Sequence, residues 1–239
     1  MNKNNNFYNE NSYILHHRPY MNTSAIIDFM TLNHGLLSVV AKGVRRKGSK
    51  KKGTLLPFNE LKISYNKKTD LGVLTNIESL APHSFLKKKS LMAGYYINEL
   101  IIRLATRNDS NIELYNAYSF AINNLSNNVD PAKYVRIFEF KLLKSIGYGI
   151  DLTKEIATRK PVESNRYYKF EPENGLIATN KSSEDKNIFL GKNLISMANK
   201  DLNDSSVLRS AKRLLSIALS HQLGGRSLKT TYVLNNLYN

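Results

Sequence analysis

The sequence predicts an α+β fold, in which a five-stranded β-barrel precedes an α-helical domain with a small β-hairpin insert. From residue 12 to about residue 79, short runs rich in β-branched and aromatic residues alternate with turn residues. After Pro82, apolar residues recur at helical spacing instead. We therefore expect a barrel over residues 12–80 and a helical domain over residues 81–239. The polar, Asn-rich residues 1–11 are expected to be disordered.

The first part of the chain contains five expected strands. Turn residues separate them, and Asn33 and Gly35 suit the tight turn of a hairpin. Five short strands are typical of a small closed barrel, and the OB-fold is the commonest such barrel that handles nucleic acid. Spacing alone does not distinguish an OB-fold from an SH3-like barrel. The expected strands are Tyr13–Tyr20, Ser24–Thr31, Gly35–Lys42, Leu61–Asn66 and Leu71–Glu78.

The second part reads as helices around one hairpin. The clearest helix start is Asp130, which can cap the helix, followed by Pro131, which suits the first helical position. Asn174-Gly175 predicts the turn of a hairpin over Tyr167–Thr179. The first helix is apolar on nearly every side, so we expect it at the centre of a bundle. The expected helices are Leu91–Thr106, Asn111–Leu125, 131–146, Asn187–Ala198, Ser205–Gln222 and a last one from Ser227 to Leu237.

The segment Lys42–Gly53, which we call the basic arm, is the most informative feature of the chain. Seven of its twelve residues are cationic and none is acidic. A charge block this dense cannot enter a core, so it must be a solvated loop. In a chain of net charge +16, it indicates a polyanionic partner, because cations that neutralise phosphates release counterions. A merely solubilising loop is the alternative. The expected phosphate contacts are Lys42, Arg45, Arg46, Lys47, Lys50, Lys51 and Lys52.

Other side chains are weaker candidates for the same partner. Arg18 could extend the basic surface or be a plain strand residue. Exposed aromatic rings could stack on bases, although core packing is the more ordinary role in so small a barrel; these are Tyr13, Tyr20 and Phe29. A second basic cluster lies on the last long helix and just after it, and a solvated helix face is the alternative; the cluster consists of Arg209, Lys212, Arg213, Arg226 and Lys229.

Composition excludes several classes of chemistry. Cysteine is absent, which removes disulfides, thiolate nucleophiles and Cys-ligated zinc. We find no nucleotide-binding, metalloprotease or hydrolase motif, so we expect a binding protein without cofactor or metal rather than an enzyme. No apolar run approaches the roughly 18 residues that span a bilayer, and the N-terminal segment has no apolar signal region. We therefore expect a cytoplasmic protein without membrane contact.

Four segments carry a resemblance to a known family. Between Leu15 and Phe58 the chain has a strand, Arg18-Pro19, a Thr/Ser-containing turn, a hairpin, and Ala41-Lys42-Gly43 followed by basic residues. The others are GYYINELIIRL (94–104), RIFEFKLLKSIGYGIDL (136–152) and LRSAKRLLSIALSHQLGGRSLKT (208–230). In this order, the segments resemble the RecO family of bacterial recombination mediators.

The resemblance implies an N-terminal OB-fold, a C-terminal helical domain and a non-enzymatic role in DNA repair and recombination at the nucleoid. RecO proteins bind single- and double-stranded DNA and anneal complementary strands. With RecR, they help load RecA onto DNA coated with single-strand-binding protein (SSB). Many members carry a four-cysteine zinc site, whereas residues 151–161 lack cysteine, so this chain resembles the zinc-free branch. An OB-fold RNA-binding protein of translation or ribosome assembly is the alternative.

The resemblance also implies a site for the acidic SSB tail, which ends in an apolar residue with a free carboxylate. Such a tail needs an apolar pocket with a cation at its rim. The matching Arg-x-Phe-Glu motif places that cation at Arg136, and its neighbours Ile137, Phe140 and Leu143 would supply the pocket. The alternative is that Arg136 only pairs with Glu139 or Glu99.

Overall fold

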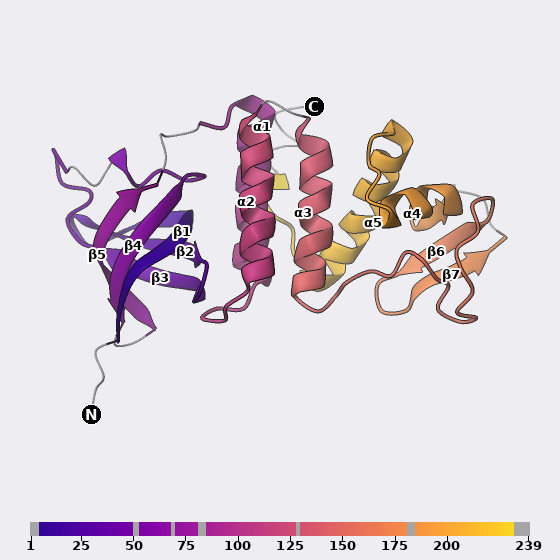
Figure 1. The fold of residues 1–239 in the computed structure, drawn as a ribbon, viewed down its shortest axis with the longest axis horizontal. Coiled ribbons are helices and arrows are strands. Elements are labelled where there is room, and N and C mark those ends of the chain that lie inside the picture. Colours follow the sequence, from indigo (N-terminus) through magenta and orange to yellow (C-terminus); the bar gives the residue numbers. More distant parts are fainter. Residues whose placement is uncertain are drawn as a thin grey trace. The chain divides into compact units, whose positions relative to one another are not determined.

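Two compact units make up the structure, which is a computed structural model. The described part of the first unit ends at residue 127, and the second unit begins at Asp130. Figure 1 traces the elements along the chain. The structure describes residues 5–49, 53–67, 70–80, 85–127, 130–180 and 185–231.

The strands of the first unit close into a barrel in the order β1-β2-β3-β5-β4, with β1 also pairing with β4 (Figure 1). Neighbouring strands are antiparallel except β3 and β5, which run parallel. The predicted five-stranded OB-fold barrel is confirmed, and its inner face is filled by apolar side chains such as Ile27, Phe29 and Ile63. The strands are β1 (Asn5–Tyr20), β2 (Ser24–Thr31), β3 (Gly35–Ala41), β4 (Glu60–Lys67) and β5 (Leu71–Ser79).

Strand β1 is longer than the sequence predicts, and the expectation that residues 1–11 are disordered is wrong for residues 5–11. Register shifts bend β1, so that its first half pairs with β4 and its second half with β2. Phe7 stacks on Tyr65 with ring centroids 4.7 Å apart, and the Asn33 backbone N–H donates to the buried Glu10 carboxylate over 2.6 Å. These contacts give the polar segment its order. Residues 1–4 lie outside the described residues.

Helices α1 (Lys88–Leu104) and α2 (Ile112–Ser126) belong to the same unit as the barrel. Asn98 on α1 links three elements, because its amide donates to the Leu15 carbonyl over 2.9 Å and accepts from the Tyr118 hydroxyl over 2.8 Å. The predicted division between residues 80 and 81 therefore separates the strands from the helices inside one unit. That this division is a domain boundary stays a prediction. The predicted place of this first helix at the centre of a bundle does not hold for all of its apolar side chains, since Tyr95 on α1 is exposed.

The second unit holds three helices and a small sheet of order β7-β6-β8 among its described residues. The predicted start of the third helix is confirmed, since the Asp130 carboxylate accepts from the Ala132 backbone N–H over 3.1 Å with Pro131 in the first turn. The predicted hairpin is confirmed as β6 and β7. The elements are α3 (Pro131–Ser145), β6 (Tyr167–Glu171), β7 (Gly175–Thr179), β8 (Ile188–Leu190), α4 (Gly191–Ala198) and α5 (Ser205–Gln222).

The predicted helix Asn187–Ala198 is wrong in its first part, because residues 188–190 form β8 against β6. The helix begins only at Gly191, where a Cβ atom would lie 1.9 Å from the Glu163 carbonyl oxygen. Gly191 is therefore the residue that lets the chain pass from sheet to helix at this close approach. Of the predicted helix from Ser227 to Leu237, residues 229–231 are helical and the part from 232 onwards lies outside the described residues.

Candidate nucleic-acid interface

The basic arm leaves the barrel at the end of β3 and returns at β4. Its base is fixed to the β1–β2 turn, since the Arg45 backbone N–H donates to the Thr23 carbonyl over 2.9 Å and the Val44 side chain is buried in the barrel core. The Arg45 guanidinium also donates to the Met21 carbonyl over 3.3 Å. Gly43 and Gly48 have positive φ values of 70° and 81°, which turn the chain outward.

The cationic side chains in the described part of the arm are open to solvent. Lys42, Arg45, Arg46 and Lys47 are all exposed, and no carboxylate of the described residues lies within 4.0 Å of their charged nitrogens. The arm cations in the described part of the chain are therefore not neutralised by an ion pair with their own protein. The remaining predicted contacts, Lys50, Lys51 and Lys52, lie outside the described residues.

Arg18 lies on the outer face of the barrel beside a buried carboxylate. Its Nη1 is 3.6 Å from Oδ2 of Asp28, and His16 Nδ1 is 3.9 Å from the same oxygen. A second arginine, Arg107, reaches Oδ1 of Asp28 over 3.4 Å. Sequence reasoning missed Arg107 because it follows α1, far along the chain from Asp28, and stands in no motif.

Two of the three aromatic candidates are core residues. Phe29 is fully buried among the inner side chains of the barrel. The buried Tyr13 ring lies 4.9 Å from the Tyr118 ring, and its hydroxyl is 3.0 Å from the Ser119 hydroxyl. Burial raises the pKa of Tyr13. Stacking of bases on Tyr13 or Phe29 is therefore wrong, whereas Tyr20 at the end of β1 is partly exposed.

The structure divides the second basic cluster, of which three members lie on α5 and two exposed members, Arg226 and Lys229, follow it. Arg209 and Lys212 are exposed, which fits both a binding surface and a plain solvated helix face. Arg213 is instead part of the fold, because its guanidinium donates to the Ile188 carbonyl and lies 4.6 Å from the centre of the Phe189 ring. These contacts hold β8 against α5, and the contact of Arg213 with DNA stays a prediction.

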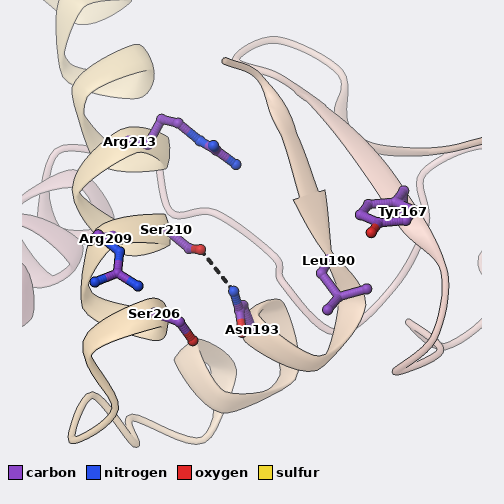
Figure 2. Close-up of a pocket in the computed structure, with 7 residues that line it drawn as sticks. All are labelled: Tyr167, Leu190, Asn193, Ser206, Arg209, Ser210 and Arg213. Atoms are coloured by element: carbon purple, nitrogen blue, oxygen red, sulfur yellow. Dashed lines mark hydrogen bonds between the residues drawn. The ribbon is translucent and has the colours of Figure 1, made fainter. Parts of the chain in front are cut away.

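A pocket of about 490 Å³ opens beside these arginines (Figure 2). Most of its lining residues carry a polar group, although more of the lining surface is apolar than polar. The Asn193 amide of α4 donates to the Ser210 hydroxyl of α5 over 2.8 Å. Figure 2 shows the side chains of Tyr167 and Leu190 on the side opposite α5. The lining residues are Tyr167, Leu190, Asn193, Ser206, Arg209, Ser210 and Arg213.

The predicted site for the SSB tail lies on α3. Arg136 pairs with the fully buried Glu139 at 3.0 Å, which is the pairing that the sequence left open as an alternative. Among the predicted pocket residues, Ile137 and Phe140 are partly exposed and Leu143 is buried. Lys144 on the same helix is exposed.

The described residues contain no group of three His, Cys, Asp or Glu side chains that could hold a metal ion. None of the helices within the described ranges is long and apolar enough to cross a membrane.

Comparison with protein families finds matches over nearly the whole chain. The family model described as "Recombination protein O N terminal" matches residues 5–83, and the one described as "Recombination protein O C terminal" matches residues 89–231. The first match covers the barrel and the second begins with α1.

Curated relatives agree with the family models. The chain is 34% identical to "DNA repair protein RecO" of Coxiella burnetii strain RSA 331, covering 94% of this chain and 97% of the relative. It is 37% identical to the protein of the same name from Mannheimia succiniciproducens, over 91% of this chain and 95% of the relative. It is 34% identical to the protein of the same name from Haemophilus influenzae strain Rd, over 92% of this chain and 93% of the relative. The resemblance that the sequence motifs indicated is thereby confirmed.

Proposed function

Because this chain belongs to the RecO family of DNA repair proteins, we propose that it binds single- and double-stranded DNA and anneals complementary strands. With RecR, it would help load RecA onto SSB-coated single strands. The observation that carries this proposal is the basic arm, whose described cations are exposed and have no carboxylate of the described residues beside them.

The arm suits the DNA backbone rather than the bases. Flexible lysines and arginines bind phosphates in any sequence, and each contact makes the affinity depend on salt. Annealing requires two polyanionic strands to approach each other, and a cationic surface lowers their repulsion. A sequence-independent mediator needs this kind of contact.

The exposed cations of α5 supply a second surface for the same backbone. Arg209 borders the pocket of Figure 2, and Lys212 lies one turn further along the helix. Two separate basic surfaces would let one molecule bind two strands at once, which is what annealing demands.

We propose that the SSB tail binds on α3 at Arg136, next to Ile137 and Phe140. Arg136 would then serve both Glu139 and the incoming carboxylate, and a planar guanidinium with five donors has the capacity to do so. Lysine keeps the charge beside Glu139 but loses this geometry, so Arg136→Lys is expected to weaken binding of a labelled tail peptide and leave DNA affinity unchanged. Equal loss of both affinities would contradict a separate tail site.

The decisive experiment is strand annealing on complementary oligonucleotides that are coated with SSB. We expect the wild-type protein to accelerate annealing through the coat, whereas an RNA-binding protein of translation or ribosome assembly would be blocked by it. An arm variant in which Lys42, Arg45, Arg46 and Lys47 are changed to Gln should lose this acceleration. The matched control removes the same charge from exposed lysines of the second unit, namely Lys154, Lys160, Lys186 and Lys200.

These partners also determine where the protein acts. A protein that binds chromosomal DNA and SSB would work at the nucleoid in the cytoplasm. Fluorescence microscopy of a tagged chain after DNA damage tests this location, and uniform fluorescence away from the DNA would contradict it.

A further inference from the structure

Asp28 is a carboxylate on the outer face of the barrel that is nevertheless almost completely buried. Asp28 lies in the middle of β2 with its side chain only 3% exposed. Its direct neighbours across the sheet are His16 on β1 and Ser38 on β3. The Ser38 hydroxyl donates a hydrogen bond to the carboxylate. A buried charge of this kind requires cationic partners.

One of those partners is held in place by the backbone. Arg107 forms an isolated parallel bridge with Leu36 of β3, and the next residue, Asn108, donates its N–H to the Leu36 carbonyl over 2.9 Å. The segment approaches so closely that a Cβ atom on Gly35 would lie 1.9 Å from the Asp109 carbonyl oxygen. Gly35, with φ of +66°, therefore permits the docking that brings Arg107 to the barrel.

The side chain of Arg107 is also held by hydrogen bonds. Its Nη1 donates to the Ser38 hydroxyl over 2.9 Å, and both Nη1 and Nη2 donate to Oδ1 of Asp28 over 3.4 Å. Arg18 approaches the other carboxylate oxygen at 3.6 Å. We call Asp28, Arg18 and Arg107 the Asp28 clasp.

The clasp holds more positive charge than its carboxylate neutralises. Arg18 and Arg107 are 53% and 46% exposed, so both guanidinium groups reach solvent from the outer face of the barrel. Each guanidinium has five N–H donors, and the contacts with Asp28 and Ser38 use only some of them. One carboxylate against two arginines leaves one net positive charge.

We propose that the Asp28 clasp is a built binding site for one phosphate group of a DNA strand. Asp28 is a positioning residue in this site: it orients two arginines so that their remaining donors converge on the phosphate. Arginine pairs bind phosphate through several parallel hydrogen bonds, and side chains already held in position lose less freedom when they bind. This inference rests on the proposed DNA-binding function and adds Arg107 and Asp28 to it.

The position of the clasp fits a strand that runs from the basic arm across the barrel. Ser38 in β3 and Lys42 at the start of the arm are four residues apart, which corresponds to roughly 13 Å along a strand. At a rise of about 3.4 Å per nucleotide, about four nucleotides cover this distance. The strand would thus contact the arm and then the clasp.

Two single substitutions test the arginines one at a time, so that Asp28 always keeps one arginine partner. Arg18→Gln and Arg107→Gln each leave one arginine beside Asp28, and the control Arg103→Gln removes the same charge from α1, where Arg103 pairs with Glu99. With a labelled single strand, each clasp variant should lose about tenfold in affinity and about 0.7 in the slope of log K against log salt. Clasp variants that match Arg103→Gln would overturn the site.

The variant Asp28→Asn separates positioning from simple charge. It makes the protein more positive, so charge alone predicts tighter binding to DNA. The clasp predicts weaker binding, by about threefold, and a smaller further loss when Arg107→Gln is added. Unchanged or tighter binding by folded Asp28→Asn protein, checked by thermal unfolding, would overturn the positioning role.

The same titrations keep this inference apart from the proposed function. If wild-type protein shows no salt-dependent DNA binding, the proposed function itself fails. If wild-type binding is normal and is lost on neutralising the arm, but Arg18→Gln and Arg107→Gln behave like Arg103→Gln, only the clasp fails.

Discussion

Each of the two units contains arginine beside a buried carboxylate, but the two sites differ in how much charge remains available. In the Asp28 clasp, one buried carboxylate meets two arginines that are about half exposed. On α3, the fully buried Glu139 meets Arg136, whose side chain is only 13% exposed. The first site leaves charge and donors at the surface, whereas the second places most of its charge inside the unit.

The comparison shows that a Lys or Arg in the sequence can bind a ligand only if the fold leaves its charged group exposed. The basic arm and the clasp keep cations exposed at the surface, while Arg136 and Arg213 each bind a group of their own unit, which leaves Arg136 only its remaining donors for the proposed SSB tail. Stability should therefore depend on the second kind of arginine and DNA affinity on the first. The predictions that follow test this separation, beginning with the largest effect.

The largest effect is expected for Arg136→Ala. Removing this arginine takes the ion-pair partner from a buried carboxylate, which costs about 3–5 kcal/mol in the free energy of unfolding. Arg107→Gln should cost less than about 1 kcal/mol, because Asp28 keeps Arg18 and the lost side chain was half exposed. Urea denaturation of both variants measures the two losses, and equal losses would break the comparison.

Neutralising the arm should have the next largest effect, and mainly on DNA binding. Changing Lys42, Arg45, Arg46 and Lys47 to Gln removes about four phosphate contacts, so the slope of log K against log salt should fall by roughly 3 for a single strand. Affinity at low salt should fall about a hundredfold, or about 2.7 kcal/mol. The free energy of unfolding should fall by less than about 1 kcal/mol, since these side chains are exposed and, within the described residues, the change removes only the hydrogen bond from Arg45 to the Met21 carbonyl. An unchanged slope would exclude the arm as the DNA site.

The neighbours Arg213 and Arg209 on α5 should behave in opposite ways. Arg213→Gln loses the contact with the Phe189 ring and the hydrogen bond to the Ile188 carbonyl, at a cost of about 1–2 kcal/mol in stability. Arg209→Gln should leave stability unchanged and lower the salt slope by about 0.7. Thermal unfolding and DNA titration of both variants test this pair, and a reversed pattern would contradict the division of the cluster.

The smallest effect on stability is expected at Asp204, an exposed carboxylate that caps the N-terminus of α5. Hydrogen bonds from Ser206 and from the Val207 backbone hold the pKa of Asp204 below its usual value. A lowered pKa means that the cap stabilises the unit above the unfolded pKa of about 3.9 and is lost as pH falls through the folded pKa. The urea midpoint of Asp204→Ala should thus lie slightly below that of wild type at pH 7, and the difference should shrink as the pH falls below the unfolded pKa. A constant difference across this range would contradict the cap.

Local patterns in the sequence were enough to predict much of the fold. Turn residues and strand-forming runs located the barrel, and Asp130-Pro131 and Asn174-Gly175 located a helix start and a hairpin. Residues 5–11 were missed because their composition is polar, and their order depends on partners such as Tyr65 that are distant in the chain. The strand 188–190 was missed because three apolar residues before a helix carry no periodic signal.

The candidate site was predicted only where charge density was high. The basic arm is dense enough in cations to indicate an exposed loop by composition alone. The clasp is not, because Asp28 and Arg107 are 79 residues apart and meet only through the docking beside Gly35. Arg213 shows the reverse case, since its position in a basic run does not reveal that it packs on Phe189.

Lysine acetylation with and without a single-stranded oligonucleotide, read out by mass spectrometry, tests the central claim most directly. If the arm binds the DNA backbone, bound DNA should protect Lys42 and Lys47, while Lys169, which pairs with Glu171, and the exposed Lys200 should react as before. Equal modification of Lys42 and Lys47 in the free and bound protein would contradict the claim.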